Sequence, residues 1–345
     1  MHYNIALIGF GGVNRALANI IATDSEKFYY DMGFNLRIVA VSDMFLGSVY
    51  SPEGIDLDLL TILPAAQGAC AKLPNGKATA DNDDIIKNSN ADIVVEATVT
   101  DSMTGQPATS HCRWALSAGK HVSTTNKGPL AFAEKELMAL ALKNNVSFEY
   151  EGVVMSGTPV LRFADKLLKG SEINKFAGIV NGTANYVLGL VEQGYTFADA
   201  ITSAQQQGYA EADPSADIEG KDVVLKVIVL ANRLWDANLT QENVQCQGIT
   251  GLTETMVKQA AAEGCHWKLL GKASKQEDGS IVASVSPEKL SIVHPLACIS
   301  GAVNAITFTS GMLGDVTVSG PGAGRIETAY AILSDIIAIH HRKGS

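Results

Sequence analysis

The chain has 345 residues, of which 46% are hydrophobic and 18% charged, so it should fold as one large or two ordinary domains around a substantial core. Its formal net charge is −10 and it contains no basic run, which argues against nucleic acid as a partner. No stretch resembles a signal peptide or reaches the length of a membrane span, so we expect a cytoplasmic protein with no membrane partner.

An apolar strand at residues 3–8 leads directly into a glycine turn, Gly9-Phe10-Gly11-Gly12-Val13-Asn14, and then into a helical pattern. In this context the first glycine permits a tight turn, the second lets the backbone approach a pyrophosphate, and the amides at the helix start hold the anion. Asn14 replaces the third glycine of the usual fingerprint and needs more room between helix and strand. The pattern predicts a dinucleotide site; a glycine turn that binds nothing is the alternative.

Apolar runs then alternate with helical patterns through the first half of the chain. The expected strands are residues 36–41, 93–96, 121–123 and 146–150; the expected helices are 107–118 and 131–143, and residues 23–34 are expected to form an extended connection. This βαβ order predicts an α/β fold, with a Rossmann-like parallel sheet that forms an NAD(P)-binding domain over residues 1–150.

Asp43 closes the second expected strand, where a carboxylate would suit a ribose hydroxyl of the cofactor. Lys and Arg are absent from residues 42–50, where a 2′-phosphate would lie, so the sequence favours NAD over NADP. The alternative is that Asp43 only caps a loop.

The strongest sign of chemistry is a group of carboxylates around one lysine: Glu211, Asp213, Asp217, Asp222 and Lys226. Asp222 and Lys226 are four residues apart, so on a helix their side chains share one face. Taken alone, this spacing favours an ordinary solvated ion pair. Reduction of an aldehyde places negative charge on its oxygen, and a lysine ammonium can stabilise that charge and donate a proton.

Residues 151–319 are expected to form a second, α+β domain with strands at 281–285, 305–308 and 316–318, and residues 320–341 a C-terminal helix that packs back on the first domain. The chain has 5 cysteines, and none has a metal-ligand or Cys/His spacing, so we expect reduced thiols.

Several segments, in order along nearly the whole chain, resemble the homoserine dehydrogenase family: GFGGVNRALA at 9–18, STTNKGPLA at 123–131, EGVVMSGTPV at 151–160, NGTANY at 181–186, EADPSADIEGKDVVLK at 211–226 and GPGAGRIETA at 320–329. The resemblance implies a nucleotide-binding domain plus a substrate-binding and dimerisation domain. It also implies interconversion of L-homoserine and L-aspartate 4-semialdehyde with NAD or NADP.

By this resemblance Lys226 is the acid/base lysine, Asp222 lies beside it and the substrate hydroxyl, and Glu211 binds the substrate ammonium. Lys127 would reach both the nicotinamide and the substrate, which leaves open which lysine transfers the proton. Further substrate contacts are expected from Gly182, Thr183 and Asp217. Further cofactor contacts are expected from Gly9, Phe10, Gly11, Gly12, Val13, Asn14, Asp43, Thr98, Ser123, Lys127 and Gly322.

The resemblance also implies a monovalent cation, Na⁺ or K⁺, at Glu151, Val154, Ser156 and Thr158, and a homodimer formed through the second domain. Because few residues follow the glycine-rich segment 320–324, we expect no regulatory domain and no feedback inhibition by threonine through one.

Other interpretations stay open. A sister dehydrogenase for another small amino or hydroxy acid would share the fold and cofactor. A phosphorylating semialdehyde dehydrogenase would need a cysteine nucleophile beside a histidine, a setting that the sequence gives to none of its cysteines. A non-catalytic NAD-binding protein would not need Glu211, Asp222, Lys226 and Lys127.

Overall fold

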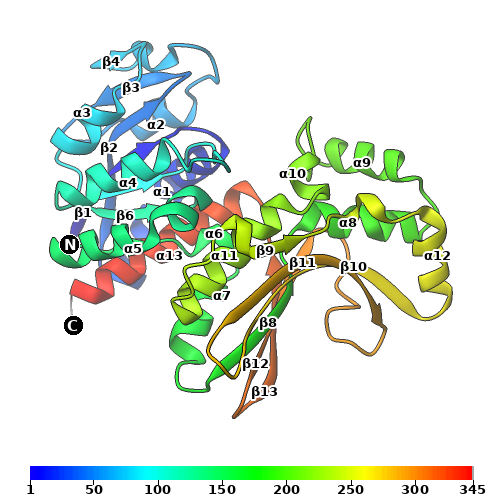
Figure 1. Ribbon diagram of the computed structural model, residues 1–345. Helices are drawn as coiled ribbons and strands as arrows, with labels where there is room; N and C mark the ends of the chain where they lie inside the picture. Colours follow the sequence, from blue (N-terminus) through cyan, green and yellow to red (C-terminus); the bar gives the residue numbers. More distant parts are fainter. Residues whose placement is uncertain (344–345) are drawn as a thin grey trace. The chain divides into compact units, whose positions relative to one another are not determined.

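The computed structural model describes residues 1–343, apart from the side chains of Ser25, Phe28, Tyr29 and Lys343. The chain divides into two units, which are taken in turn (Figure 1). The first unit contains Met1–Val153 and the segment from Gly324 onward; the second contains Val154–Ala323. Among the described residues, no helix is both long enough and apolar enough to cross a membrane.

The first unit is built on a sheet in the order β4-β3-β2-β1-β5-β6-β7. Its strands are β1 (His2–Ile8), β2 (Asn35–Asp43), β3 (Gly47–Tyr50), β4 (Gly76–Lys77), β5 (Ile93–Glu96), β6 (His121–Thr124) and β7 (Phe148–Glu149). Strands β2, β1, β5, β6 and β7 run parallel, and β3 and β4 are antiparallel additions at one edge. The predicted α/β fold with a Rossmann-like parallel sheet is confirmed.

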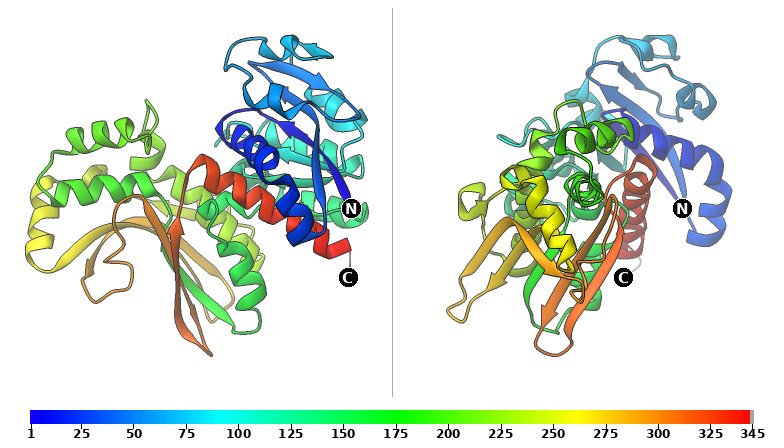
Figure 2. Two further views of the ribbon diagram at one scale, coloured as in Figure 1. Left: turned by 180° about the vertical axis from the view of Figure 1, so that it is seen from behind. Right: turned by 90° about the vertical axis from the view of Figure 1, so that its right-hand side faces the viewer.

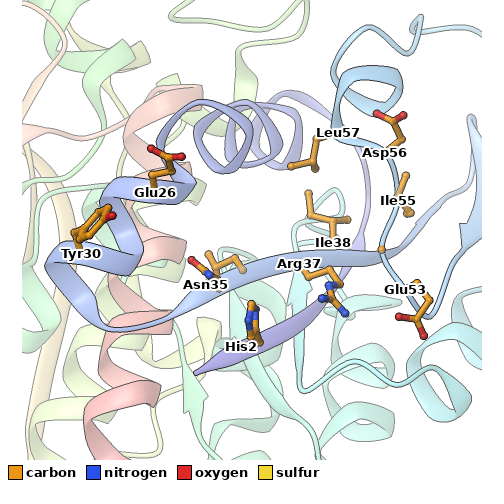
Figure 3. A pocket seen from close by; sticks show the side chains of 12 residues that line it. His2, Glu26, Tyr30, Asn35, Arg37, Ile38, Glu53, Ile55, Asp56 and Leu57 are labelled. Atoms are coloured by element: carbon orange, nitrogen blue, oxygen red, sulfur yellow. The ribbon is translucent and has the colours of Figure 1, made fainter.

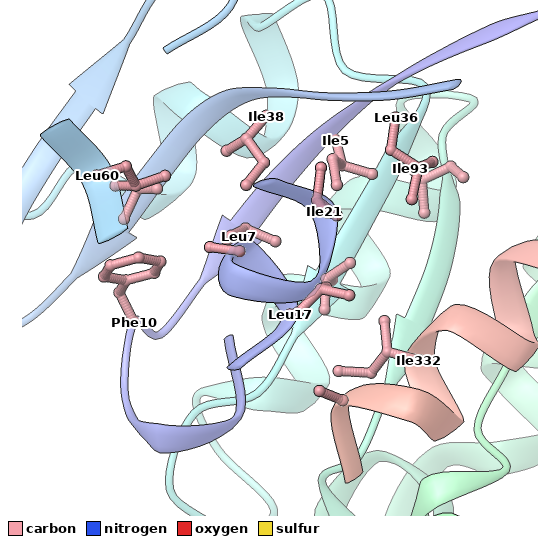
Figure 4. Packing of buried hydrophobic residues seen from close by; sticks show 14 of the residues in the cluster. Ile5, Leu7, Phe10, Leu17, Ile21, Leu36, Ile38, Leu60, Ile93 and Ile332 are labelled. Atoms are coloured by element: carbon pink, nitrogen blue, oxygen red, sulfur yellow. The ribbon is translucent and has the colours of Figure 1, made fainter. Parts of the chain in front are cut away.

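The helices of this unit are α1 (Gly12–Met32), α2 (Leu57–Thr61), α3 (Asn82–Asn88), α4 (Ala108–Ser117), α5 (Lys127–Lys143) and α13 (Arg325–Lys343). Helices α1 and α13 pack side by side (Figure 2). Leu7 of β1, Leu17 of α1, Ile38 of β2 and Ile332 of α13 meet in one buried apolar cluster (Figure 4). This core fixes the position of the glycine turn between β1 and α1.

Some expected boundaries are wrong. The extended connection at 23–34 does not exist, because α1 continues to Met32; no Gly or Pro interrupts it before Gly33, whose φ of +74° ends the helix. Helix α5 begins at Lys127 rather than at residue 131, since the Asn126 side chain accepts a hydrogen bond from the backbone of Gly128 and so caps it. Strand β7 is shorter than expected and pairs with β6 at the end of the strand order.

The second unit contains a sheet in the order β13-β12-β8-β10-β11-β9. Its strands are β8 (Ile173–Ile179), β9 (Val244–Cys246), β10 (Cys265–Lys275), β11 (Ile281–Ser291), β12 (Val303–Ser310) and β13 (Gly314–Pro321). Its main helices are α8 (Gly182–Glu192), α9 (Phe197–Gln206), α10 (Ser215–Ile218), α11 (Lys221–Trp235) and α12 (Glu254–Ala262). Helix α11 packs on β10 at Gly271, where a Cβ would lie 2.6 Å from the Val227 side chain.

Candidate active site

Lys226 lies on α11 and is buried, with only 7% of its surface exposed. Its ammonium is 2.8 Å from Asp222 Oδ2, one turn earlier on the helix, and it donates a 2.6 Å hydrogen bond to the Val180 carbonyl at the end of β8. Gly220, with φ +83°, turns the chain into α11 and so places Asp222 in its first turn. A burial of this degree contradicts a solvated surface ion pair, because a charge removed from water needs compensating partners.

Asn181 joins the two carboxylates next to this lysine. Its Nδ2 donates to Asp217 Oδ1 at 2.6 Å and to Asp222 Oδ2 at 3.0 Å, while its Oδ1 accepts from the Ala184 amide and caps α8. The turn between β8 and α8 therefore brings an amide to a lysine with two carboxylates. Asn181 was not among the residues predicted from the sequence, although it directly precedes the predicted residues Gly182 and Thr183 in the NGT segment.

The other expected substrate residues lie in the same unit. The Glu211 side chain is exposed and its carboxylate makes no hydrogen bond or ion pair with the described residues. Thr183 is buried, and its hydroxyl donates to the Tyr209 carbonyl at 2.6 Å. A Cβ on Gly182 would lie 2.6 Å from the Ala302 carbonyl oxygen, so this glycine permits close packing.

In the first unit, the glycine turn lies where β1 is flanked by β2 and β5. Open α/β sheets bind ligands at such a switch point. Gly9 has φ +77°, and a Cβ there would lie 2.8 Å from the Ala97 carbonyl oxygen after β5, so no other residue fits. Among the described residues, no atom lies within 4 Å of a Cβ position on Gly11, which leaves room for a pyrophosphate to approach the backbone.

Asn14 fills the space that a third glycine would leave open. It is fully buried, and its Nδ2 donates to the Gly9 carbonyl at 2.6 Å and contacts the Ile8 carbonyl at 3.4 Å. The departure from the fingerprint therefore ties the turn to α1 and does not disrupt it.

Phe10 is also held through its backbone. Its amide donates to Asp43 Oδ2 at 2.8 Å, and its carbonyl accepts from Arg15 Nε at 3.1 Å. Because the C=O and N–H of a trans peptide point in opposite directions, the Arg15 contact turns the amide of Gly11 away from Arg15 Nε. The turn is thus fixed with its amides oriented before any cofactor binds.

Asp43 caps the loop after β2. Its Oδ1 accepts from the amides of Phe45 at 2.8 Å and Leu46 at 3.0 Å, in addition to the Phe10 bond to Oδ2. A ribose hydroxyl at this carboxylate would therefore add to an existing set of backbone bonds.

The remaining expected cofactor residues are distributed over both units. Lys127 is the first residue of α5, and Asn126 just before it donates from Nδ2 to the Thr98 carbonyl at 3.0 Å, so Thr98 and Lys127 lie on loops that touch. The fully buried Ser123 donates its hydroxyl to Asp335 on α13 at 2.6 Å. Gly322, in the second unit, packs against Asn304, since a Cβ there would overlap the Asn304 amide at 1.9 Å.

The residues expected to bind a cation are all buried. Glu151 belongs to the first unit, where its amide donates to Asp335 Oδ1 at 3.2 Å. Val154, Ser156 and Thr158 belong to the second unit, and Ser156 has φ +50°. The described residues contain no cluster of three or more His, Cys, Asp or Glu side chains that could hold a metal ion, so ligands here would be mainly carbonyl oxygens.

A cavity of about 730 Å³ opens at the opposite edge of the first sheet, near the first residues of β1 and β2 (Figure 3). His2, Glu26, Tyr30, Arg37 and Glu53 are among its lining residues. It includes none of the residues expected to bind cofactor or substrate. Because parallel sheets bind ligands at the carboxyl ends of their strands, we do not assign the cofactor to it.

Cys112 does not provide the nucleophile of a phosphorylating dehydrogenase. It is fully buried next to His111 in α4, and burial together with the nearby Glu96 carboxylate raises the pKa of its thiol. A thiol that stays protonated is a poor nucleophile.

Arg325 is a cofactor-site candidate that sequence analysis missed. It begins α13, and its Cδ and Nε each lie 2.8 Å from a Cβ position on Gly12, in the first turn of α1. Its side chain is exposed and makes no hydrogen bond or ion pair with the part of the chain that the structure describes. The signal was its place directly after the glycine-rich segment 320–324.

Two family models match consecutive parts of the chain. Residues 9–151 match the family model "Homoserine dehydrogenase, NAD binding domain", and residues 159–337 match the model "Homoserine dehydrogenase". The chain is 57% identical over 338 residues to the NAD(+)-dependent homoserine dehydrogenase of Pseudomonas canavaninivorans, a match that covers 98% of this chain and 96% of that protein.

Solved structures of similar shape carry the same family name. A putative homoserine dehydrogenase from Archaeoglobus fulgidus superimposes with a TM-score of 0.87 at 33% identity, over 98% of this chain and 99% of the other. A hyperthermophilic archaeal homoserine dehydrogenase in complex with NADPH superimposes with a TM-score of 0.83 at 30% identity, over 99% and 98% of the two chains.

Proposed function

Because the chain belongs to the homoserine dehydrogenase family, and so interconverts L-homoserine and L-aspartate 4-semialdehyde with a nicotinamide cofactor, we propose that Lys226 carries the proton in this reaction. The observation that supports this role is the geometry of its amine, which is buried yet held by Asp222 and the Val180 carbonyl. Lys127, at the start of α5, is the second candidate.

When bound, the nicotinamide supplies or accepts the hydride. As the aldehyde is reduced, negative charge develops on its oxygen, and the Lys226 ammonium stabilises this charge and donates a proton to it. In the opposite direction, the neutral amine accepts the proton of the homoserine hydroxyl. Asp222 and the Val180 carbonyl hold the amine in place in both directions.

The substrate carries an ammonium and a carboxylate at its other end. Glu211 suits the ammonium, since its exposed carboxylate has no partner among the described residues. Asp217, held by Asn181, adds negative charge near Lys226, and Gly182 and Thr183 follow Asn181 at the start of α8. The family models and the 57% identical relative are named for homoserine dehydrogenase, so a sister dehydrogenase with another substrate is not favoured.

NAD is used at least as well as NADP in this proposal. The glycine turn has the open Gly11 that a dinucleotide needs, and the Phe10 amide ties this turn to Asp43. Asp43 stands at the end of β2, where its charge would repel a 2′-phosphate. Thr98, Lys127 and Arg325 are the further contacts; the Ser123 hydroxyl is already used by Asp335 and is left out.

A monovalent cation, Na⁺ or K⁺, bound by Glu151, Val154, Ser156 and Thr158 is part of the proposal. Full exchange of both ions for tetramethylammonium should lower activity, and adding either back should restore it. Activity that does not change on exchange would remove the cation from the proposal.

We further propose a cytoplasmic homodimer formed through the second unit. Several large apolar side chains are exposed on the ends and connections of its strands, and such surfaces favour association; they are Val282, Ile292, Val293, Met312 and Leu313. Light scattering at working concentration should give twice the chain mass, and a result of 36.4 kDa would contradict a dimer.

The direct test is to incubate the protein with NAD or NADP and a panel of hydroxy amino acids while following the absorbance of the reduced nicotinamide. L-Homoserine should be oxidised with the highest kcat/KM. Preference for another member of the panel would favour the sister dehydrogenase, and nucleotide binding without turnover would favour a non-catalytic protein.

A further inference from the structure

Glu96 has no part in the substrate and cofactor roles proposed above. It is the last residue of β5, at the carboxyl edge of the parallel sheet, and none of its surface is exposed (0%). A buried carboxylate is costly unless its oxygens are fully hydrogen-bonded, so its presence at this edge needs an explanation.

Both Glu96 oxygens accept hydrogen bonds from neighbouring elements. Oε1 accepts from the Thr98 amide at 3.2 Å and from the Thr98 hydroxyl, and it lies 3.4 Å from His111 Nδ1. Oε2 accepts from the Thr124 hydroxyl at 3.2 Å, and the hydroxyl shares its proton with the Glu96 backbone carbonyl at 3.1 Å. No Lys or Arg among the described residues forms an ion pair with this carboxylate; the His111 ring is its basic neighbour.

The tautomer of His111 follows from its contact with Asn82. The Ser42 hydroxyl donates to Asn82 Oδ1 at 2.5 Å, which turns Asn82 Nδ2 toward His111 Nε2 at 3.0 Å. Nε2 must then be the acceptor, so the ring proton is on Nδ1 and donates to Glu96. Glu96 then accepts at every one of these contacts, a role that both of its carboxylate oxygens can fill.

A short chain of hydrogen bonds connects the Glu96 carboxylate to the start of α5, where Lys127 lies. The Thr124 hydroxyl that donates to Glu96 accepts from the Asn126 amide at 3.1 Å. Asn126 in turn donates from Nδ2 to the Thr98 carbonyl at 3.0 Å and accepts from the Gly128 amide at 2.9 Å, which caps α5 at Lys127. Glu96 therefore lies between the two loops that carry Thr98 and Lys127.

We propose that Glu96 is a positioning residue: its buried carboxylate joins the loop after β5 to the loop after β6 and thereby fixes Lys127 relative to Thr98. The inference rests on the proposed roles of Lys127 and Thr98 at the substrate and cofactor. Small errors of placement are enough to slow a reaction, because reacting groups must be held within a fraction of an ångström.

Glu96→Gln tests this with little change of volume. The amide of Gln cannot accept from every donor that now meets the carboxylate, so the two loops lose their common anchor. We expect kcat/KM for homoserine to fall by about tenfold or more, in keeping with the loss that a small misplacement causes. Values within about twofold of wild type would overturn the proposal.

A double variant separates positioning of Lys127 from general damage. If Glu96 acts through Lys127, then Glu96→Gln should change kcat by less than about twofold when Lys127→Met is already present, since coupled residues are not additive. A loss that adds in full to that of Lys127→Met would overturn the proposal.

The matched control is Lys120→Met. Lys120 is a buried, hydrogen-bonded charge directly before the other end of β6, where it donates to the Ser89 carbonyl at 2.7 Å. It should leave kcat/KM near wild type although it also removes a buried, hydrogen-bonded charge; an equal kinetic loss in both would overturn the proposal.

If Glu96→Gln does not fold, Thr124→Val removes the bridge between Glu96 and Asn126 and should show the same pattern with Lys127→Met. Additive losses for this variant would also overturn the inference. The wild-type assay distinguishes failure of the proposed function from failure of this inference. An inactive wild type contradicts the proposed function. An active wild type with an unaffected Glu96→Gln variant contradicts only the role of Glu96.

Discussion

Lys226 Nζ lies 2.8 Å from Asp222 Oδ2, and the two residues are one turn apart on α11. The spacing alone fits a surface ion pair of little consequence, worth up to about 1 kcal/mol. Burial changes this, because the lysine is enclosed and its second contact, the Val180 carbonyl, comes from another element. The pair is therefore part of an enclosed site, and its effects on kcat and on protein stability can be measured separately.

Lys226→Ala should lower kcat by roughly 100-fold or more, the range of a lost general acid or base, while NAD affinity stays close to wild type. Lys226→Arg should rescue poorly, because a guanidinium stays protonated and has another shape. Steady-state kinetics and nucleotide titration measure both.

Lys127→Ala is the comparison variant for this experiment. If kcat survives removal of Lys226 but collapses without Lys127, the acid/base assignment moves to Lys127, and Lys226 becomes an electrostatic partner of Asp222.

Asp43→Ser should raise the KM for NAD and relax discrimination against NADP, because it removes a carboxylate from the end of β2. The same change frees the amides of Phe10, Phe45 and Leu46. Asp43→Asn also removes the charge, but its single oxygen can still accept from the amides of Phe45 and Leu46, so only the bond from the Phe10 amide is lost.

Initial rates with both cofactors measure the outcome. A wild-type preference for NADP of tenfold or more, equivalent to about 1.4 kcal/mol, would contradict the assignment of Asp43. A KM for NAD that is unchanged in both variants would show that Asp43 only caps its loop.

The parts of the fold that depend on local sequence could be predicted. The strand, glycine turn and helix at the start follow one another along the chain, and the Asp222–Lys226 contact needs only helical spacing. Strands β8, β9 and β10 were missed. The sequence of β10 is CHWKLLGKASK, which has no clean alternation, so its pairing with β8 and β11 determines it.

The contacts that complete the site connect residues far apart in the sequence. Val180 is 46 residues from Lys226, and Asn181 is 41 residues from Asp222. Lys77 is a further example. Residues 42–50 contain no Lys or Arg, but the pairing of β4 with β3 brings Lys77 next to this segment. The Lys77 ammonium pairs with Asp81 at 3.1 Å, so we still expect a preference for NAD although this lysine lies nearby.

Lys120 should make stability depend on pH. Burial lowers the pKa of this lysine to about 8, a shift that the charge of Asp92 opposes. Between that value and its pKa of about 10.4 in the unfolded chain, the unfolded state binds more protons, so this lysine contributes stability that increases as the pH rises.

The thermal midpoint of wild type relative to Lys120→Met should therefore be higher at about pH 9.5 than at about pH 7. The neutral amine can still donate to Ser89, so its hydrogen bonds are not lost at high pH. Exposed Lys143, replaced by Met, is the control and should show no such trend. A difference that stays constant or reverses would show that burial does not lower the pKa of Lys120.

Arg325→Met should weaken cofactor binding through the pyrophosphate. The guanidinium stem lies against Gly12 in the first turn of α1, where amides and a positive helix end already favour an anion. Because this attraction is the same in the ground and transition states, the KM for NAD should rise with little change in kcat.

Inhibitors that differ in phosphate content distinguish charge from shape. Competitive inhibition by ADP should weaken by roughly five- to tenfold in Arg325→Met, in keeping with the loss of a charge-assisted hydrogen bond, and inhibition by adenosine should not change. Arg325→Lys should recover part of the effect, and Arg342→Met, at the other end of α13, should behave as wild type. Equal losses for ADP and adenosine would show that Arg325 supports the shape of the turn and does not bind the pyrophosphate.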